Sequence, residues 1–196
     1  MDQEDRRRSE PWAGWATEPV VVVDHDPAWA DRGVTERDLL QPLLRTWLTG
    51  DLEHVGSTAV PGLAAKPVID LQAPVADLRA ADAIAGVVAP HHWHQVPPEL
   101  DQRPYRRFFV KVLDGQRVAH LHVMTTGSSR WHQQLAFRNA LRADPALVAA
   151  YARLKRQLAH DHPDDREAYT AGKRGSSTTS SPATGLTQGA EVRPPP

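Results

Sequence analysis

Apolar positions along the chain follow two spacings, one typical of helices and the other of strands. The helical spacing covers residues 29–47, 75–88, 129–141 and 145–160. Short runs rich in β-branched or aromatic residues predict strands over residues 20–23, 52–55, 68–73, 93–96, 107–113 and 116–124, the first of them buried. This order of elements predicts an α+β (mixed α/β) fold, in which helices flank a mixed sheet.

Local signals predict where several of these elements begin and end. Asp114-Gly115 lies between the last two predicted strands and is typical of a two-residue hairpin turn. Asp144 precedes a proline and predicts a capped helix start, because its side chain can accept hydrogen bonds from backbone N–H groups of the first turn. Asp26 predicts the same arrangement for the first helix, and Ser128 for the helix over residues 129–141.

Composition changes at both ends of the chain. Residues 1–18 are polar and show no periodic pattern, so we expect a disordered leader there. Gly, Ser, Thr and Pro dominate residues 172–196, and a segment of that composition is expected to be a disordered tail. Residues 19–171 are expected to form one domain, because about 150 residues suffice for an ordinary hydrophobic core.

Charge and cysteine content exclude several classes of function. The chain has 23 Lys and Arg residues against 24 Asp and Glu residues, and this balance gives no general attraction to nucleic acid or to an anionic membrane. The absence of cysteine excludes disulfides, thiolate metal sites and cysteine catalysis. No apolar stretch has the length of a signal peptide or a membrane span, and we expect a cytoplasmic protein.

One segment combines a strand end, small residues and a carboxylate. Gly56 lets a ligand approach the backbone, Ser57 offers a hydroxyl group, and the neighbouring N–H groups can point at an anion. Asp70 follows inside an apolar strand, where a carboxylate is costly unless it is paired or holds a metal. The positive charge of Lys66 can pair with that carboxylate or with a phosphate. Spacing alone leaves a second interpretation open, in which Asp70 lies at a sheet edge and faces solvent.

The order of these residues resembles two known groups of proteins. Gly-Ser at a strand end, followed about a dozen residues later by acidic residues on the next strand, resembles the nucleotidyltransferase superfamily, in which Gly-Ser holds a triphosphate and carboxylates bind two Mg²⁺ ions. The segment from His54 to Asp70 is similar to the GrpB family, and the similarity extends over residues 20–173. It implies a nucleotidyltransferase-like sheet. It also implies that nucleotide or phosphate binds at Gly56, Ser57, Thr58, Lys66 and Arg107.

A later strand supplies two histidines. His120 and His122 are two residues apart and therefore share one face of their strand. The resemblance places that strand beside Asp70, so the candidate catalytic residues are Asp70, His120 and His122, with Asp70 and His122 as candidate metal ligands. Imidazoles and a carboxylate suit Zn²⁺, Mn²⁺ or Fe²⁺ better than a pair of Mg²⁺ ions. Alternatively, the histidines donate to a phosphate, act as general acid or base, or are buried structural residues.

Three further positions bear on this site. Arg106 and Arg107 point to opposite faces of their strand, so one of them can reach the cleft, and Arg107 is the candidate for bidentate contact with phosphate. His54 either lines the cleft or packs as a structural residue. Gln72 stands where an active transferase has its second carboxylate, a departure that is common in the GrpB family.

Two functions are compatible with these patterns. The first is transfer of a nucleotidyl or phosphoryl group, with a nucleotide or phosphorylated small molecule as partner and Mg²⁺, Mn²⁺ or Zn²⁺ as cofactor. The second is an inactive module that binds such a ligand. The resemblance also implies a link with coenzyme A metabolism, because GrpB-like domains occur fused to dephospho-CoA kinase in some bacteria. Neither function involves a membrane or calls for nucleic acid, and the patterns do not indicate an oligomeric state.

Overall fold

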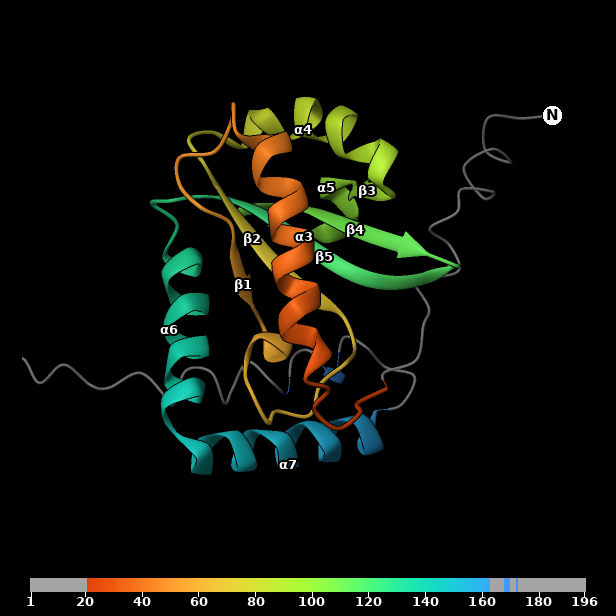
Figure 1. Cartoon of the computed structure of the whole chain (residues 1–196), viewed down its shortest axis with the longest axis vertical. Coiled ribbons are helices and arrows are strands. Elements are labelled where there is room, and N and C mark those ends of the chain that lie inside the picture. Colours follow the sequence, from red (N-terminus) through yellow and green to blue (C-terminus); the bar gives the residue numbers. More distant parts are fainter. Residues whose placement is uncertain (1–20, 163–167, 170–171, 173–196) are drawn as a thin grey trace, which may run out of the picture.

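A five-stranded mixed sheet forms the centre of the protein in a computed structural model, which describes residues 21–162, 168, 169 and 172 (Figure 1). The strands are β1 (Glu53–Val55), β2 (Ile69–Val75), β3 (Trp93–Val96), β4 (Arg106–Leu113) and β5 (Gln116–Thr125). The longer helices are α3 (Ala28–Leu44), α4 (Ala81–Val88), α6 (Ser129–Ala143) and α7 (Pro145–Asp161). The short helical segments are η1 (Ser57–Ala59), η2 (Leu78–Ala80), η3 (Ala89–His91) and α5 (Pro98–Asp101). The predicted mixed α/β fold is thus confirmed.

The sheet brings together strands that are far apart in the sequence. Its order is β1-β2-β5-β4-β3, with β2 and β5 parallel and the other neighbours antiparallel. In this register Asp70 is the neighbour of His120, and Gln72 is the neighbour of His122. Phe108 of β4 lies opposite His122 on the other side of β5. The strand pairing therefore sets the candidate residues side by side.

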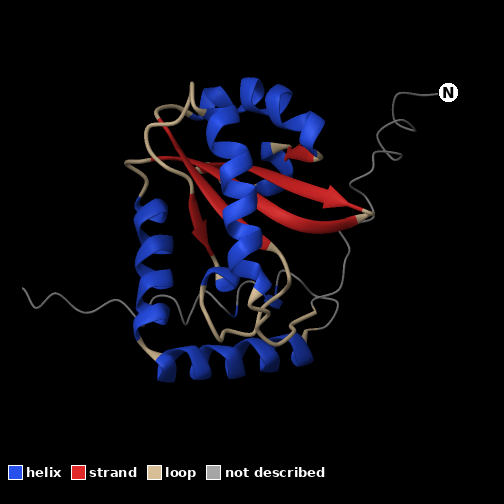
Figure 2. Ribbon diagram, viewed as in Figure 1, coloured by secondary structure: helices blue, strands red, loops and turns tan. Residues whose placement is uncertain are grey.

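The two faces of the sheet have different roles. Helices α3 and α4 cover one face, where they form the main hydrophobic core with alternate residues of the strands, such as Leu71, Phe109 and Leu121 (Figure 2). Because successive strand residues point to opposite faces, Asp70 and His122 lie on the other face. Burying one face against helices thus leaves polar residues of β2 and β5 together on the second face.

A smaller hydrophobic cluster joins the loop before β2 to the last two helices. Val60 and Leu63 from the loop pack with Leu141 of α6 and Tyr151 of α7. Figure 1 shows α7 running across the end of the domain below this loop, with α6 beside β1. The cluster fixes the loop that carries Gly56 and Ser57 against two helices from the other end of the sequence.

Several local predictions are confirmed. The Asp144 carboxylate accepts hydrogen bonds from the N–H groups of Ala146 and Leu147, at 2.8 and 3.2 Å, and α7 begins there. Asp114 and Gly115 both have positive φ, 50° and 74°, as a type I′ hairpin turn requires. The Asp26 carboxylate accepts from the N–H of Ala28 at the start of α3. Ser128 precedes α6 but makes no capping hydrogen bond through its side chain.

The predicted buried strand over residues 20–23 is wrong in its described part. Val21 and Val23 are 55% and 39% exposed, and Val23 forms only an isolated bridge with Ala65. A run of β-branched residues forms a buried strand only where a neighbouring strand and a core receive it. This run has one bridging residue instead.

The predicted helix over residues 75–88 begins too early. Val75 ends β2, and the helix α4 starts only at Ala81. The Asp77 carboxylate accepts a hydrogen bond from the N–H of Arg79, and this contact caps the short turn η2 before the helix.

The predicted leader lies outside the described residues, as does nearly all of the predicted tail. No helix in the described ranges has the length and apolar character needed to cross a membrane.

Candidate functional site

Asp70, His120 and His122 meet on the face of the sheet opposite α3. The Oδ1 atom of Asp70 lies 2.8 Å from Nδ1 of His120 and 3.5 Å from Nε2 of His122. One potential ligand atom from each residue falls within 4.8 Å of the others. The three residues that the sequence pattern selected as a centre are therefore neighbours in space.

Gly56 lies directly against Asp70. Its φ of 71° is in the region that favours glycine, and a Cβ atom at this position would lie 2.9 Å from Cβ of Asp70 and closer still to Oδ2. Since real Cβ contacts of under 3.0 Å essentially never occur, only glycine fits here without displacing the carboxylate. The Gly-Ser turn and the aspartate are thus parts of one site.

Electrostatics keep Asp70 ionised and His122 neutral. Burial opposes the charge of Asp70, but hydrogen bonds from His120 and His122 outweigh it and lower the pKa of the carboxyl group. Burial, followed by the charge of Arg106, lowers the pKa of His122 to about 4. At neutral pH the site therefore carries a carboxylate beside an uncharged imidazole.

Arg106 fixes the position of the proton on His122. Nη1 of Arg106 donates to Nδ1 of His122, because a guanidinium group has no acceptor. The single proton of the neutral ring then lies on Nε2, which faces Asp70. The Arg106 guanidinium is itself held by Asp101, through Nε to Oδ2 at 2.9 Å and Nη2 to Oδ1 at 2.5 Å, and lies over the Phe108 ring at 4.1 Å.

The choice of Arg107 as the arginine of this site is not supported by its position. Arg107 alternates with Arg106 along β4 and so points to the opposite face, and its Nη1 donates to the backbone carbonyl of Arg106 at 3.0 Å. Which of two adjacent residues faces the site depends on the pairing of β4 with β5. The sequence of β4 alone does not contain that information.

Ser57 has a cationic partner that the sequence analysis did not select. Nζ of Lys155, from α7, donates to Oγ of Ser57 at 3.0 Å and to the carbonyl of Ala64. Lys155 is buried, and its ammonium group lies 5.0 Å from the centre of the Tyr151 ring. No local motif marks this lysine, because the contact spans 98 residues of sequence.

Thr58 and His54 form hydrogen bonds that support the Gly56–Ser57 turn. The Thr58 hydroxyl donates to the carbonyl of Val68 at 3.1 Å, so His54 Nε2, 3.1 Å from Thr58 Oγ1, is the donor in that contact. Burial is the main cause that lowers the pKa of His54 to about 4, and the ring packs against Gly33 with no room for a Cβ atom there. His54 is therefore a packed neutral histidine, and Thr58 supports the turn.

Two other selected residues lie around the centre. Gln72 is fully buried, and its Nε2 reaches the backbone carbonyl of Trp131 at 3.5 Å, which directs the amide toward α6. Nζ of Lys66 lies 5.9 Å from the centre of the Tyr169 ring. Arg106, Asp101 and Lys155 complete the polar surroundings of Asp70. Of these, only Arg106 was considered from the sequence, as one of two adjacent arginines of which one can reach the cleft.

Comparison with known proteins identifies the family. The GrpB protein family model matches residues 19–179. A UPF0157 protein of Pseudomonas aeruginosa is 36% identical over 168 residues, which cover 83% of this chain and 66% of that protein. The solved structure of the conserved protein GrpB from Enterococcus faecalis is 29% identical, with a TM-score of 0.69, and the match covers 81% of this chain and 98% of that one.

Two more distant similarities extend this comparison. A dephospho-CoA kinase of Mycolicibacterium paratuberculosis is 29% identical over 187 residues, which cover 81% of this chain and 44% of the kinase. The structure of a cytoplasmic RNA terminal U-transferase has a TM-score of 0.43 and 15% identity, and no activity follows from that degree of similarity. The chain spans 66% of the Pseudomonas relative and 44% of a Bacillus subtilis relative. By its sequence over most of its length and by its fold, the chain belongs to the GrpB family.

Proposed function

We propose that this protein binds a nucleotide or another phosphorylated small molecule at the sheet face that carries Asp70, together with a single divalent ion. The observation that carries the proposal is the convergence of Asp70, His120 and His122 beside the Gly56–Ser57 turn. Ligand atoms that share a metal ion at bond lengths of about 2.1 Å lie roughly 3.0 to 3.4 Å apart. The 2.8 and 3.5 Å separations around Asp70 Oδ1 are close to that range.

The donor set fits one ion and does not fit two. A carboxylate with two imidazoles suits Zn²⁺, Mn²⁺ or Fe²⁺. A two-ion centre needs further carboxylates to bridge the ions, whereas position 72 holds a buried amide that points to Trp131. When bound, the ion would neutralise charge on the phosphate oxygens of the ligand. This difference favours ligand binding over the two-metal transfer of the nucleotidyltransferase superfamily.

The residues around the ion site have separate roles in this proposal. Gly56 leaves space for the Asp70 carboxylate, and Lys155 orients the Ser57 hydroxyl group. Arg106 provides positive charge next to His122, where an anion benefits from it. In the metal-free protein the Nε2 proton of His122 faces Asp70, so coordination by His122 requires Arg106 to release Nδ1. Asp70 and His120 meet no such obstacle from Arg106.

Transfer of a nucleotidyl or phosphoryl group is the second candidate function. It is supported by the order of Gly-Ser, strand and aspartate that the chain shares with the superfamily, and it is weakened by Gln72. A role connected with coenzyme A metabolism is supported by the similarity to part of a dephospho-CoA kinase. A turnover measurement separates transfer from binding alone.

Calorimetric titration of the full chain tests the proposal. Mn²⁺ and Zn²⁺ are titrated first, then ATP in the presence and absence of each ion, and product formation is followed by chromatography. The Asp70→Asn variant should lose the ion and the ion-dependent part of ATP binding. The matched control Asp38→Asn makes the same chemical change on the exposed side of α3 and should bind like the wild type. Equal binding by the Asp70→Asn variant and the wild type would show that the site is misassigned, and turnover would favour the transferase.

A further inference from the structure

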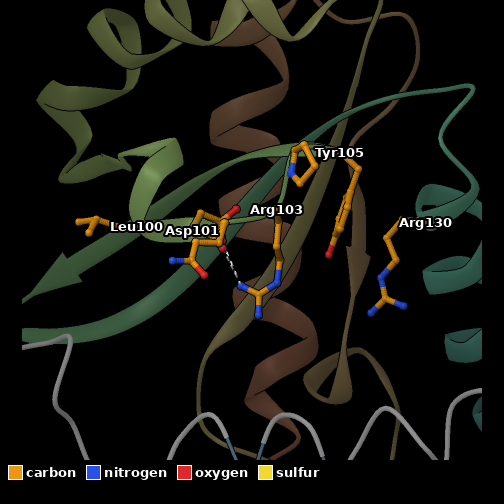
Figure 3. Close-up of a pocket in the computed structure, with 7 residues that line it drawn as sticks. Leu100, Asp101, Arg103, Tyr105 and Arg130 are labelled. Carbon is orange, nitrogen blue, oxygen red and sulfur yellow. Dashed lines mark hydrogen bonds and ion pairs between the residues drawn. The ribbon is translucent and has the colours of Figure 1, made fainter.

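A pocket of about 720 Å³ lies between the segment after α5 and the start of α6, and its lining residue Asp101 holds Arg106 of the candidate site. Its walls include Asp101, Gln102, Arg103, Tyr105 and Arg130. In the view of Figure 3, the side chain of Tyr105 is drawn between those of Arg103 and Arg130. The volume falls in the range of small-molecule sites.

The pocket carries an excess of positive charge. Asp101 accepts from Arg103 at 3.1 Å and from Arg106 at 2.5 Å, so one carboxylate is shared between two guanidinium groups. Arg130 adds another positive charge, and no carboxylate lies within ion-pair distance of it in the described part of the chain. An anion entering the pocket would meet charge that the protein does not itself neutralise.

Arg130 has unused hydrogen-bonding capacity. Its Nε atom is buried and has no hydrogen-bond partner among the described residues, and its Nη1 makes only a 3.5 Å contact with Gln133. A buried donor without a partner is costly, and such groups in native proteins usually have a specific reason. Arg130 is also the second residue of α6, whose first turn has no side-chain cap and presents the positive end of the helix dipole.

Tyr105 supplies a flat wall for a ring. It is 37% exposed although it is a large aromatic residue in the lining of a pocket. Aromatic faces hold planar rings by stacking, and in nucleic-acid-binding proteins they do so for every base. The pocket therefore joins a stacking surface to two guanidinium groups that can hold a phosphate.

The pocket and the Asp70 centre share a continuous set of contacts. Asp101 lines the pocket and holds Arg106, Arg106 donates to His122, and His122 faces Asp70. An anion that draws Arg103 away from Asp101 would leave Arg106 as the remaining ion-pair partner of Asp101.

We infer that this pocket binds the phosphate and planar ring of the ligand, and that the ligand is therefore a nucleoside monophosphate or a larger molecule that contains one. The inference rests on the proposed function in taking the ligand to be a phosphorylated molecule. Arg130 and Arg103 hold the phosphate, and Tyr105 stacks on the base. The pocket is then connected to the Asp70 centre by the contacts of Asp101 with Arg106 and of Arg106 with His122.

Titration of the full chain with AMP, in EDTA so that no metal contributes, tests the assignment. Adenosine lacks the phosphate and ribose 5-phosphate lacks the base, and each should bind at least about tenfold more weakly than AMP. The Arg130→Gln variant should lose about tenfold or more in AMP affinity. Tyr105→Leu should weaken AMP binding, whereas Tyr105→Phe should retain it. Arg153→Gln, on the exposed side of α7, is the matched control and should bind like the wild type.

Each contrary result has a distinct meaning. Equal AMP affinity in the Arg130→Gln and Arg153→Gln variants would overturn the inference, as would equal binding of AMP and ribose 5-phosphate or no AMP binding by the wild type. Mn²⁺ binding should be unchanged in the Arg130→Gln and Tyr105→Leu variants, which also shows that both are folded. If the wild type binds Mn²⁺ but not AMP, the pocket alone is rejected. If the wild type does not bind Mn²⁺, the proposed ion site is rejected.

Discussion

The carboxylate of Asp70 occupies the space in which any residue other than glycine at position 56 would place its Cβ atom. Gly56 belongs to the turn after β1 and Asp70 to β2, and the contact between them joins the turn to the centre of the sheet. A substitution at Gly56 therefore acts on backbone conformation and on the position of Asp70 together. Mn²⁺ binding reports the displacement of Asp70 separately from stability, and Gly62, a second glycine with a similar positive φ, provides the comparison.

The Gly56→Ala variant should be less stable than Gly62→Ala and should lose ion binding. Gly62 has a φ of 74°, like the 71° of Gly56, but a Cβ atom there meets nothing within 4 Å. Gly62→Ala should therefore show only the conformational cost of about 1–2 kcal/mol. Urea unfolding and Mn²⁺ titration measure both effects. Equal destabilisation with intact Mn²⁺ binding would contradict the contact between Gly56 and Asp70.

The stability of the protein should fall as the pH drops from about 6.5 toward 4, partly because of His54. Burial lowers the pKa of His54 to about 4, so in that window the unfolded chain takes up a proton that the folded protein does not. One such histidine contributes a slope of up to about 1.4 kcal/mol per pH unit in the free energy of unfolding. Above pH 6.5 the contribution is constant.

His54→Gln tests this dependence. The glutamine amide can still donate to Thr58, but it does not titrate. Urea unfolding of both proteins between pH 4 and 7 should show a shallower slope in the variant. Parallel curves would mean that His54 titrates alike in the folded and unfolded states.

Lys155→Met should destabilise the protein by about 1–3 kcal/mol and disturb the Ser57 turn. Lys155 is 1% exposed, and its removal leaves the Ala64 carbonyl and the Ser57 hydroxyl without their donor. Arg153→Met, an exposed cation on the same helix, should change the free energy of unfolding by less than about 0.5 kcal/mol. If the two variants unfold at the same urea concentration, the buried lysine does not support the turn as described.

Arg106→Gln should tighten the binding of Zn²⁺. Arg106 forces the proton of His122 onto Nε2, whereas a glutamine oxygen can accept a hydrogen bond from Nδ1–H and leave Nε2 for the ion. The gain should approach about tenfold, as measured by competition with a coloured chelator. Arg107→Gln, one residue away on the other face of β4, is the control and should bind Zn²⁺ like the wild type. Weaker binding in the Arg106→Gln variant would remove His122 from the ligand set.

The elements that the sequence predicted well are those set by short-range chemistry. Asp114-Gly115 specifies a hairpin turn through backbone conformations that these residues adopt readily, and Asp144 caps α7 with its own side chain. The shared face of His120 and His122 was predicted in the same way, because two residues of spacing place both imidazoles on one side of a strand. Each of these depends on neighbours within a few positions, whereas the placement of that strand beside Asp70, 50 residues away, came from the resemblance to the nucleotidyltransferase superfamily.

The residues that the sequence did not reveal depend on contacts between distant segments. Lys155 reaches Ser57 across 98 positions, and the preference for Arg106 over Arg107 follows from how β4 pairs with β5. The run at residues 21–23 has strand-forming composition, but the fold gives Val23 only an isolated bridge. Composition describes what a segment can form, and the remaining structure decides which option is realised.

The pairing of β4 with β5 shifts by one residue between Lys111 and Val112, where Arg117 is paired with Val112 and Ala119 with Lys111. Val118 is the extra residue, and the ladder continues from Ala119 with His120 opposite Val110. Had the ladder run on from the turn without this irregularity, His120 would be opposite Phe109 and both imidazoles would enter the hydrophobic core. The irregularity at Val118 therefore reconciles a two-residue turn with the placement of the histidines, and deletion of Val118 should remove the irregularity and preserve the site. One further residue inserted between the turn and His120 would demand a second such irregularity.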